Sequence, residues 1–192
     1  MAAHLWSAGA CRSITERDGG ATAAKITGAR RIIVLGPPGS GKSTMARWLG
    51  ERFGLPVYHL DQAWWRPGWV EAPAAEFAAE VERLAALPAW VIDGNFTATL
   101  APRLAMADAA VYLDIPSWLS VMRVVARTIR WRGQVRGDMP AGCPERFDPA
   151  FFVFTWRWNR ERRVRNIGFV TAFYGRSVIL RGPGAVRRFM RG

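Results

Sequence analysis

Residues 35–44, with the sequence LGPPGSGKST, combine glycines, a lysine and a hydroxyl side chain at the spacing G-x-x-x-x-G-K-S/T. Glycines allow tight backbone turns that point successive N–H groups at one anion. Lys42 adds a point charge for the outer phosphates of such an anion, and the Ser43 hydroxyl can ligate Mg²⁺. The stretch therefore indicates a phosphate-binding loop. We expect its contacts at Gly36, Gly39, Ser40, Gly41, Lys42, Ser43 and Thr44.

The sequence on both sides of this loop agrees with that interpretation. Residues 31–35 are a short run of mainly aliphatic residues, which predicts a buried parallel strand. Residues 42–53 predict a helix that ends at Gly54, and the N-terminal dipole of a helix favours an anion. The order strand, glycine loop, helix predicts a site for ATP and Mg²⁺. The alternative is a glycine-rich turn that matches by accident, although the chain has only two lysines with which to do so.

Further strands and helices alternate along the chain. Strands are predicted at 56–60, 89–92, 110–113 and 177–180, and helices at 74–86, 97–106, 117–131 and 149–174. Residues 132–148 are rich in glycine and proline, which predicts a loop. We therefore predict an α/β fold of three layers, a P-loop NTPase fold, with a five-stranded parallel sheet, helices on both faces and an arginine-rich lid at about 132–148.

Three of the predicted strands end in an acid, at Asp61, Asp93 and Asp114. Ligands of open parallel sheets bind at the carboxyl ends of the strands, so we expect the three acids on the same edge as Lys42. Any one of them could instead be a helix cap or a turn residue. Together with the phosphate loop, they favour Mg²⁺ ligation or binding of a second substrate.

The charge of the chain is unevenly distributed. The net charge is +12 over 192 residues; residues 1–122 are neutral and residues 123–192 carry the whole excess. A field of this kind attracts polyanions, so nucleotide phosphates and non-specific binding of a nucleic acid are both open. Two cysteines do not suggest a disulfide framework, and no apolar run is long enough for a membrane helix. A cytoplasmic protein without membrane contact is expected.

Residues 1–29 differ in composition from the rest. They are rich in Ala, Gly, Ser and Thr and show no sustained periodicity. We expect a disordered N-terminal extension over 1–29 and a single domain over 30–192.

Several of these segments resemble known kinases. Residues 90–96 (WVIDGNF) and 111–116 (VYLDIP) resemble the corresponding segments of adenylate kinases and related small P-loop kinases. The resemblance is strongest to a bacterial group described as DNA topology modulation proteins, through 55–61 (LPVYHLD), 65–69 (WRPGW) and 132–145. It covers about residues 30–190. Adenylate kinases have Phe-Pro-Arg where this chain has Asn95-Phe96-Thr97, and that arginine normally holds the acceptor phosphate.

The resemblance implies roles for individual residues. It places Asp93 beside Ser43 at the Mg²⁺ site. If the phosphoryl acceptor is a hydroxyl, Asp61 is the candidate general base. If it is a phosphate, no base is needed and Arg66 becomes more important.

The helix at 117–131 carries two stripes. Leu119, Met122, Ala126 and Ile129 are spaced as an inward apolar stripe, and Arg123, Arg127 and Arg130 lie on another face. A solvated basic face is one interpretation. The other is a lid whose arginines stabilise charge on the transferred phosphoryl group, for which we select Arg127, Arg132 and Arg136.

Two functions remain open from the sequence. The first is an ATP-dependent phosphotransferase acting on a nucleotide, a nucleoside or another small acceptor. The second is an ATP-binding protein that interacts with DNA through its basic C-terminal half and modulates DNA topology.

Overall fold

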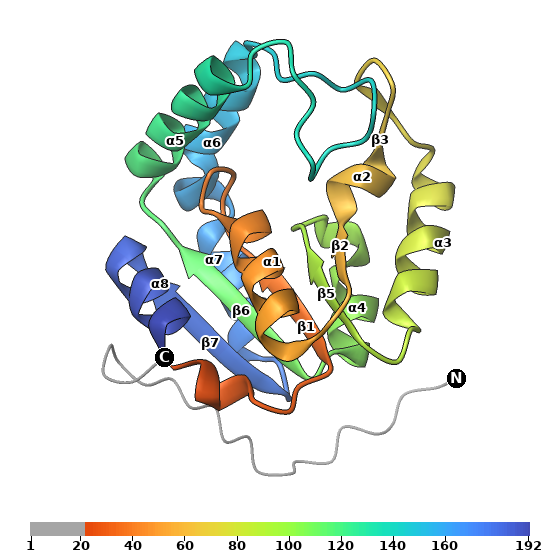
Figure 1. The fold of residues 1–192 in the computed structure, drawn as a ribbon, viewed down its shortest axis with the longest axis vertical. Helices are drawn as coiled ribbons and strands as arrows, with labels where there is room; N and C mark the ends of the chain where they lie inside the picture. Colours follow the sequence, from red (N-terminus) through yellow and green to blue (C-terminus); the bar gives the residue numbers. More distant parts are fainter. Residues whose placement is uncertain (1–21) are drawn as a thin grey trace.

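The computed structural model describes residues 22–192, and its core is one parallel sheet with helices on both faces (Figure 1). The order of the strands is β2-β5-β1-β6-β7, and every pairing is parallel. The predicted α/β fold with a five-stranded parallel sheet is therefore confirmed. The strands are β1 (Arg31–Leu35), β2 (Val57–His59), β5 (Trp90–Asp93), β6 (Ala109–Asp114) and β7 (Arg176–Arg181).

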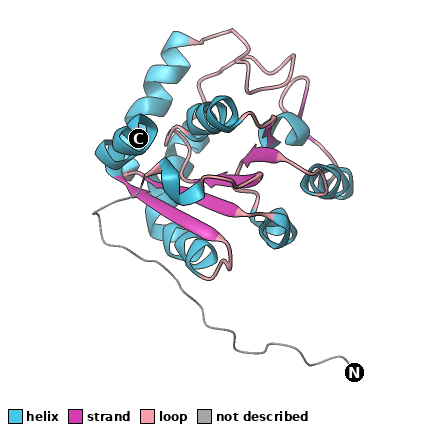
Figure 2. Cartoon of the chain, turned by 60° about the horizontal axis from the view of Figure 1, so that its bottom comes forward, coloured by secondary structure: helices cyan, strands magenta, loops and turns pink. Residues whose placement is uncertain are grey.

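The helices form the two outer layers, which Figure 2 shows around the strands. The helices are α1 (Lys42–Phe53), α2 (Leu60–Trp64), α3 (Ala74–Ala85), α4 (Leu100–Met106), α5 (Ser117–Arg130), α6 (Pro149–Glu161), α7 (Arg163–Thr171) and α8 (Gly182–Arg191). Short 3₁₀ turns occur at η1 (Ala23–Ile26) and η2 (Thr97–Thr99), and a small hairpin pairs β3 (Trp65–Arg66) with β4 (Val70–Glu71).

The alternation of side chains along β1 produces two cores. Ile32 and Val34 belong to the cluster under α1 and α8, whereas Ile33 and Leu35 belong to the cluster under α3, α4 and α7. Because successive side chains of a strand point to opposite faces, a strand with four consecutive aliphatic residues, 32–35, suits a position between two helical layers. The strand that precedes the phosphate loop is therefore fixed from both sides.

The strand order places the phosphate loop at the centre of the sheet edge. β1 lies between β5 and β6, and the chain leaves β1 toward β2 on one side and reaches β6 on the other. This is the topological switch point, at which open α/β sheets bind their ligands. No helix among residues 22–192 is long and apolar enough to cross a membrane.

Part of the expected N-terminal extension belongs to the folded core. Ala23, Ile26 and Ala29 are buried in the cluster that includes Phe189 of α8, so the expected start of folding at Arg30 is wrong by several residues. The small residues of this stretch gave no helical periodicity because only one 3₁₀ turn is formed. Residues 1–21, the remainder of the expected extension, lie outside the described residues.

The helix predicted at 149–174 is two helices. The backbone leaves the helical region at Arg162, with φ −126° and ψ −22°, between α6 and α7. The next residue, Arg163, forms two hydrogen bonds of 2.6 and 2.7 Å with Asp114 at the end of β6. The break therefore lets α6 pack on α5 while α7 packs on the sheet.

Of the four residues in the apolar stripe predicted on α5, Leu119 packs against the core but the other three are exposed, so most of the stripe was assigned to the wrong face. Met122 is 62% exposed and Ile129 74% exposed, whereas Ser120, Val124 and Thr128 face inward. The inward face needs small and polar residues because the phosphate loop approaches it closely: a Cβ on Gly39 would lie 2.5 Å from the Ser120 carbonyl oxygen. Hydrophobic spacing alone could not indicate that contact. The short elements α2, β3, β4 and α8 were not predicted.

The role of η1 can be tested by removing its buried side chain. Ile26→Ala should lower the free energy of unfolding by roughly 2–4 kcal/mol, because it leaves a cavity in the core. Ala24→Ser, on the exposed side of the same turn, should change it by less than about 0.5 kcal/mol. Chemical denaturation measures both. An Ile26→Ala protein as stable as the wild type would show that this turn is not part of the folded core.

Candidate active site

The phosphate loop adopts a conformation that requires its glycines. Gly39 and Gly41 have φ values of +71° and +96°, in the region that other residues rarely adopt. A Cβ on Gly36 would lie 2.7 Å from the Leu113 carbonyl oxygen. The loop leads directly into α1, which begins at Lys42, so the N-terminal amides of that helix face the space enclosed by the loop.

Lys42 is a half-buried ammonium without an anionic partner among residues 22–192. Its Nζ donates to the Pro37 carbonyl oxygen at 3.0 Å, and no ion pair within residues 22–192 includes it. Burial lowers the pKa of Lys42, and the negative charges of Asp93 and Asp61 act in the opposite direction. The Ser40 hydroxyl is also buried and has no hydrogen-bond partner. A cation and a hydroxyl left unsatisfied in a ring of glycines fit the phosphate chain of ATP.

Two of the three strand-end acids lie near Lys42, as expected. Asp93 is paired with His59, whose Nδ1 is 2.6 Å from an oxygen of the Asp93 carboxylate. Burial alone would lower the pKa of His59, but the hydrogen bond and charge of Asp93 raise it above its ordinary value. Burial, and then the charge of Asp93, raise the pKa of Asp61. Asp61 is thus a carboxyl group that holds a proton more readily than usual beside the phosphate loop.

Asp114 is the exception among these acids. Its carboxylate is bonded to Arg163 of α7, through the two hydrogen bonds described above, and is only 8% exposed. The carboxylate is thus occupied by Arg163, and the expected part of Asp114 in Mg²⁺ or substrate binding stays a prediction. Its function is to join α7 to the end of β6, which a spacing of 49 residues could not indicate.

The metal site remains a prediction for Ser43 and Asp93. No group of three or more His, Cys, Asp or Glu side chains within the described residues could hold a metal ion. Ser43 stands at the start of α1, and its side chain lies near Asp138 of the 132–148 segment. Mg²⁺ retains several waters beside one or two protein ligands, so the Ser43 hydroxyl suits it without a protein cage.

Asn95 fixes the phosphate loop from the neighbouring strand. Its side-chain Nδ2 donates to the Gly36 carbonyl oxygen at 2.8 Å, and its Oδ1 accepts from the Gly36 amide at 3.2 Å. Through these two bonds the Asn95 side chain pairs with both backbone groups of Gly36, as a residue of a neighbouring β-strand would. Asn95 is thereby used to hold the loop, at the position where adenylate kinases carry phenylalanine.

Arg103, which the sequence gave no reason to select, holds Asn95 in place. The guanidinium is fully buried and donates to the carbonyl oxygens of Gly94 (2.8 Å), Asn95 (2.7 Å), Phe96 (3.2 Å) and Thr99 (3.1 Å). Burial lowers the pKa of Arg103 to about 9, so it is still charged at neutral pH. It has no carboxylate partner, and its role depends on the unusual backbone at Gly94 (φ +130°) and Phe96 (φ +23°).

The 132–148 segment brings two of the three predicted lid arginines together. Arg127 and Arg136 both contact the Glu145 carboxylate, at 3.2 and 2.9 Å. Arg132 is exposed, and only its backbone pairs with that of Glu145. Arg123 of α5 donates to the Ser40 carbonyl oxygen at 3.3 Å. Arginines of α5 thus face the phosphate loop rather than forming only a solvated basic face.

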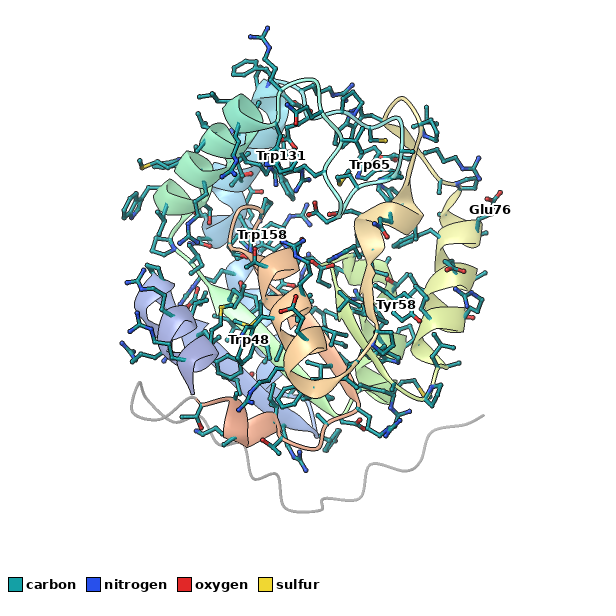
Figure 3. All side chains as sticks on the ribbon, in the orientation of Figure 1. Trp48, Tyr58, Trp65, Glu76, Trp131 and Trp158 are labelled. Carbon is teal, nitrogen blue, oxygen red and sulfur yellow. The ribbon has the colours of Figure 1, made fainter. Side chains whose placement is uncertain are left out.

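The same segment lies against α2 and the β3–β4 hairpin. Gln62 donates to the Gly137 carbonyl oxygen at 3.0 Å, the Gly68 amide to that of Gly142 at 2.8 Å, and Trp69 to that of Pro144 at 3.0 Å. Figure 3 shows side chains filling the region between α5, α2 and this segment, with Trp131 and Trp65 on either side of it. The segment therefore spans from the arginine-bearing helix to the elements that follow Asp61.

Comparisons with solved structures are consistent with this geometry. The fold is that of the P-loop kinases. Shikimate kinase from Acinetobacter baumannii, in complex with shikimate, is similar with a TM-score of 0.53 and 20% identity, over 88% of this chain and 92% of that chain. A gluconokinase from Sinorhizobium meliloti 1021 has a TM-score of 0.49 and 18% identity, over 84% of this chain and 87% of that chain.

No family model and no curated protein matches the chain. At these identities the structural likeness establishes the shared fold alone. The resemblance to DNA topology modulation proteins and the binding of a nucleic acid stay predictions.

The role of Asn95 predicts a defect in nucleotide binding without loss of the fold. Asn95→Ala removes both bonds to Gly36 and should weaken Mg-ATP binding about tenfold, measured by titration calorimetry. Asn166→Ala is a matched control, because its side-chain amide donates to the Arg162 carbonyl oxygen outside the loop. Equal affinities of Asn95→Ala and wild type would remove Asn95 from the account of the loop.

Proposed function

We propose that this protein is an ATP-dependent phosphotransferase that acts on a small acceptor, with a hydroxyl compound favoured over a phosphate. One observation carries the proposal: the half-buried ammonium of Lys42, which forms no ion pair within residues 22–192, lies close enough to Asp61, a carboxyl group of raised pKa, for their charges to interact. The fold shared with P-loop kinases supports the same reaction class.

The residues of the phosphate loop would bind and orient the nucleotide. Lys42 and the loop amides would hold the β- and γ-phosphates, and Ser40 would complete its hydrogen bonding with them. The Ser43 hydroxyl would hold Mg²⁺, which would neutralise charge on those phosphates. Asp93 would act through the water shell of the ion while His59 holds its carboxylate.

Asp61 would accept the proton of the acceptor hydroxyl. The acceptor oxygen forms its bond to the γ-phosphorus as the bond from that phosphorus to the leaving ADP breaks, and the hydroxyl proton moves to Asp61. A base works best when its pKa lies near the working pH, so a raised carboxyl pKa suits this task. A phosphate acceptor would need no base.

The cations on the acceptor side also favour a hydroxyl compound. Thr97 stands where adenylate kinases carry the arginine for acceptor phosphate. Arg66 on the hairpin is bonded to Glu76 of α3, and Arg136 is bonded to Asp138 and Glu145. An acceptor phosphate would have to displace these carboxylates from their arginines.

A coupled assay of ADP release tests the proposal. The acceptors are sugars and polyols, amino alcohols, nucleosides and nucleoside monophosphates, each measured against Lys42→Ala as background. Asp61→Asn should lower kcat by about 100-fold or more, because it removes the base. Glu51→Gln, on the exposed side of α1, should not. The proposal would be refuted if no class of acceptor raises ADP release by the wild-type protein above that of Lys42→Ala.

The pH dependence follows from the direction of the Asp61 shift. Only the ionised carboxylate can accept a proton, so the rate should fall as the pH is lowered through its pKa. Because burial raises that pKa, the fall should begin at higher pH than for an ordinary aspartate. The residual activity of Asp61→Asn should lack this acid limb. An identical limb in both proteins would assign the titration to another group.

A further inference from the structure

Glu145 is a buried carboxylate held between two arginines from different parts of the chain. It is 6% exposed, and its Oε1 accepts from Arg127 Nε at 3.2 Å and from the Thr128 hydroxyl at 3.2 Å, both on α5. Its Oε2 is 2.9 Å from Arg136 Nε, an ion pair whose N–H direction is not aligned for a hydrogen bond. Removing such a carboxylate leaves two buried cations facing each other.

Glu145 contacts only one side of the guanidinium group of Arg127 and of Arg136. Arg127 presents Nε and Nη2 to Glu145, and Arg136 presents Nε. The terminal Nη1 of Arg136 instead donates to Asp138 at 2.9 Å. A guanidinium has five N–H donors in a planar fork, so an arginine held by its Nε side still offers terminal N–H groups to a second anion.

Asp138, the second anion bound by Arg136, lies next to the phosphate loop. Asp138 accepts a hydrogen bond from Arg136, lies near the Ser43 side chain, and its charge acts on Lys42. The charge of Arg127 acts on Lys42 as well. The carboxylate of Asp138 therefore occupies a position bounded by Lys42, Ser43 and Arg136, all of which are suited to phosphate oxygens.

We propose that Glu145 is a positioning residue that holds Arg127 and Arg136 by their Nε sides, so that their terminal N–H groups face the phosphates of the bound nucleotide. Asp138 stands beside Arg136 where a phosphate oxygen would bind, and it gives up that arginine when the nucleotide enters. This inference rests on the ATP site of the proposed function, but it does not depend on the acceptor.

The charges explain why a carboxylate is needed here. Burial, and then the neighbouring charge of Arg136, lower the pKa of Arg127, whereas Glu145 raises it. Like charges at short range repel strongly when water is excluded, so without Glu145 the two guanidinium groups would separate. The backbone of Glu145 is fixed independently, through Gly133 and Gln134 at 3.0 and 2.9 Å. Neutralising the side chain should therefore leave the path of the chain intact.

A double-mutant cycle on Mg-ATP affinity tests the proposal without any acceptor. The proteins are wild type, Glu145→Gln, Arg136→Ala and the double variant, measured by titration calorimetry after thermal unfolding has shown that each is folded. Glu145→Gln should weaken Mg-ATP binding about tenfold, and the combined loss should fall well short of the product of the two single losses. Glu80→Gln, in an exposed ion pair with Arg83 on α3, is the matched control and should bind like wild type.

The outcomes separate this inference from the proposed function. The inference would be overturned if the losses of Mg-ATP affinity in the two single variants multiply in the double variant. It would also be overturned if Glu145→Gln binds Mg-ATP as tightly as wild type. Tighter binding by Glu145→Gln would overturn it too, because Glu145 would then compete with the phosphates for the arginines. Should Glu145→Gln fail to fold, Glu145→Asp takes its place in the cycle, because it keeps the charge with a shorter reach, and the same criteria apply. If the double-mutant cycle shows coupling between Glu145 and Arg136 but the wild-type protein transfers no phosphoryl group to any acceptor, the proposed function alone would be overturned. Absence of Mg-ATP binding by wild type would overturn both.

Discussion

The site depends on one half-buried charge that the protein itself does not neutralise. Among residues 22–192, Lys42 has one hydrogen-bond partner, the Pro37 carbonyl oxygen, and the nearby carboxylates of Asp93 and Asp61 are not bonded to it. Leaving an ammonium in this state costs stability, because burial disfavours the charged form. A phosphate chain would satisfy Lys42, the Ser40 hydroxyl and the loop amides together. Nucleotide binding would therefore offset the cost of keeping this ammonium in the loop.

The rest of the structure maintains this arrangement from three directions. Asn95, itself held by the buried Arg103, pairs with Gly36 from the β5 side. From the other side α5 approaches so closely that only a glycine fits at position 39. Above the loop, Glu145 joins Arg127 to the 132–148 segment. A loop with several positive-φ residues is costly to order, and these contacts hold one conformation before any ligand arrives.

Local patterns predicted the sheet and the loop well, because aliphatic strands and the glycine–lysine spacing are read over a few residues. Those patterns could not predict pairings between distant residues. Asp114 bonds an arginine 49 positions away, and Arg103 binds carbonyl groups, which leave no mark in a sequence. Most of the stripe on α5 was assigned to the wrong face because contact with a glycine loop selects small inward residues, such as Ser120, over large ones. Arg127 and Arg136, selected from the sequence as lid arginines, both contact Glu145, which the sequence did not single out; their role in the lid stays a prediction.

The most direct test of the central claim is the stabilisation of the fold by Mg-ATP in wild type and in Lys42→Met. The free energy of unfolding would be measured by denaturation against increasing nucleotide concentration. Wild type should gain stability in proportion to the logarithm of free Mg-ATP above its Kd, as expected for a ligand that binds only the folded state. Without nucleotide, Lys42→Met should be at least as stable as wild type, because the buried charge is gone, and added Mg-ATP should change its stability little. Equal stabilisation of the two proteins by Mg-ATP would contradict the account.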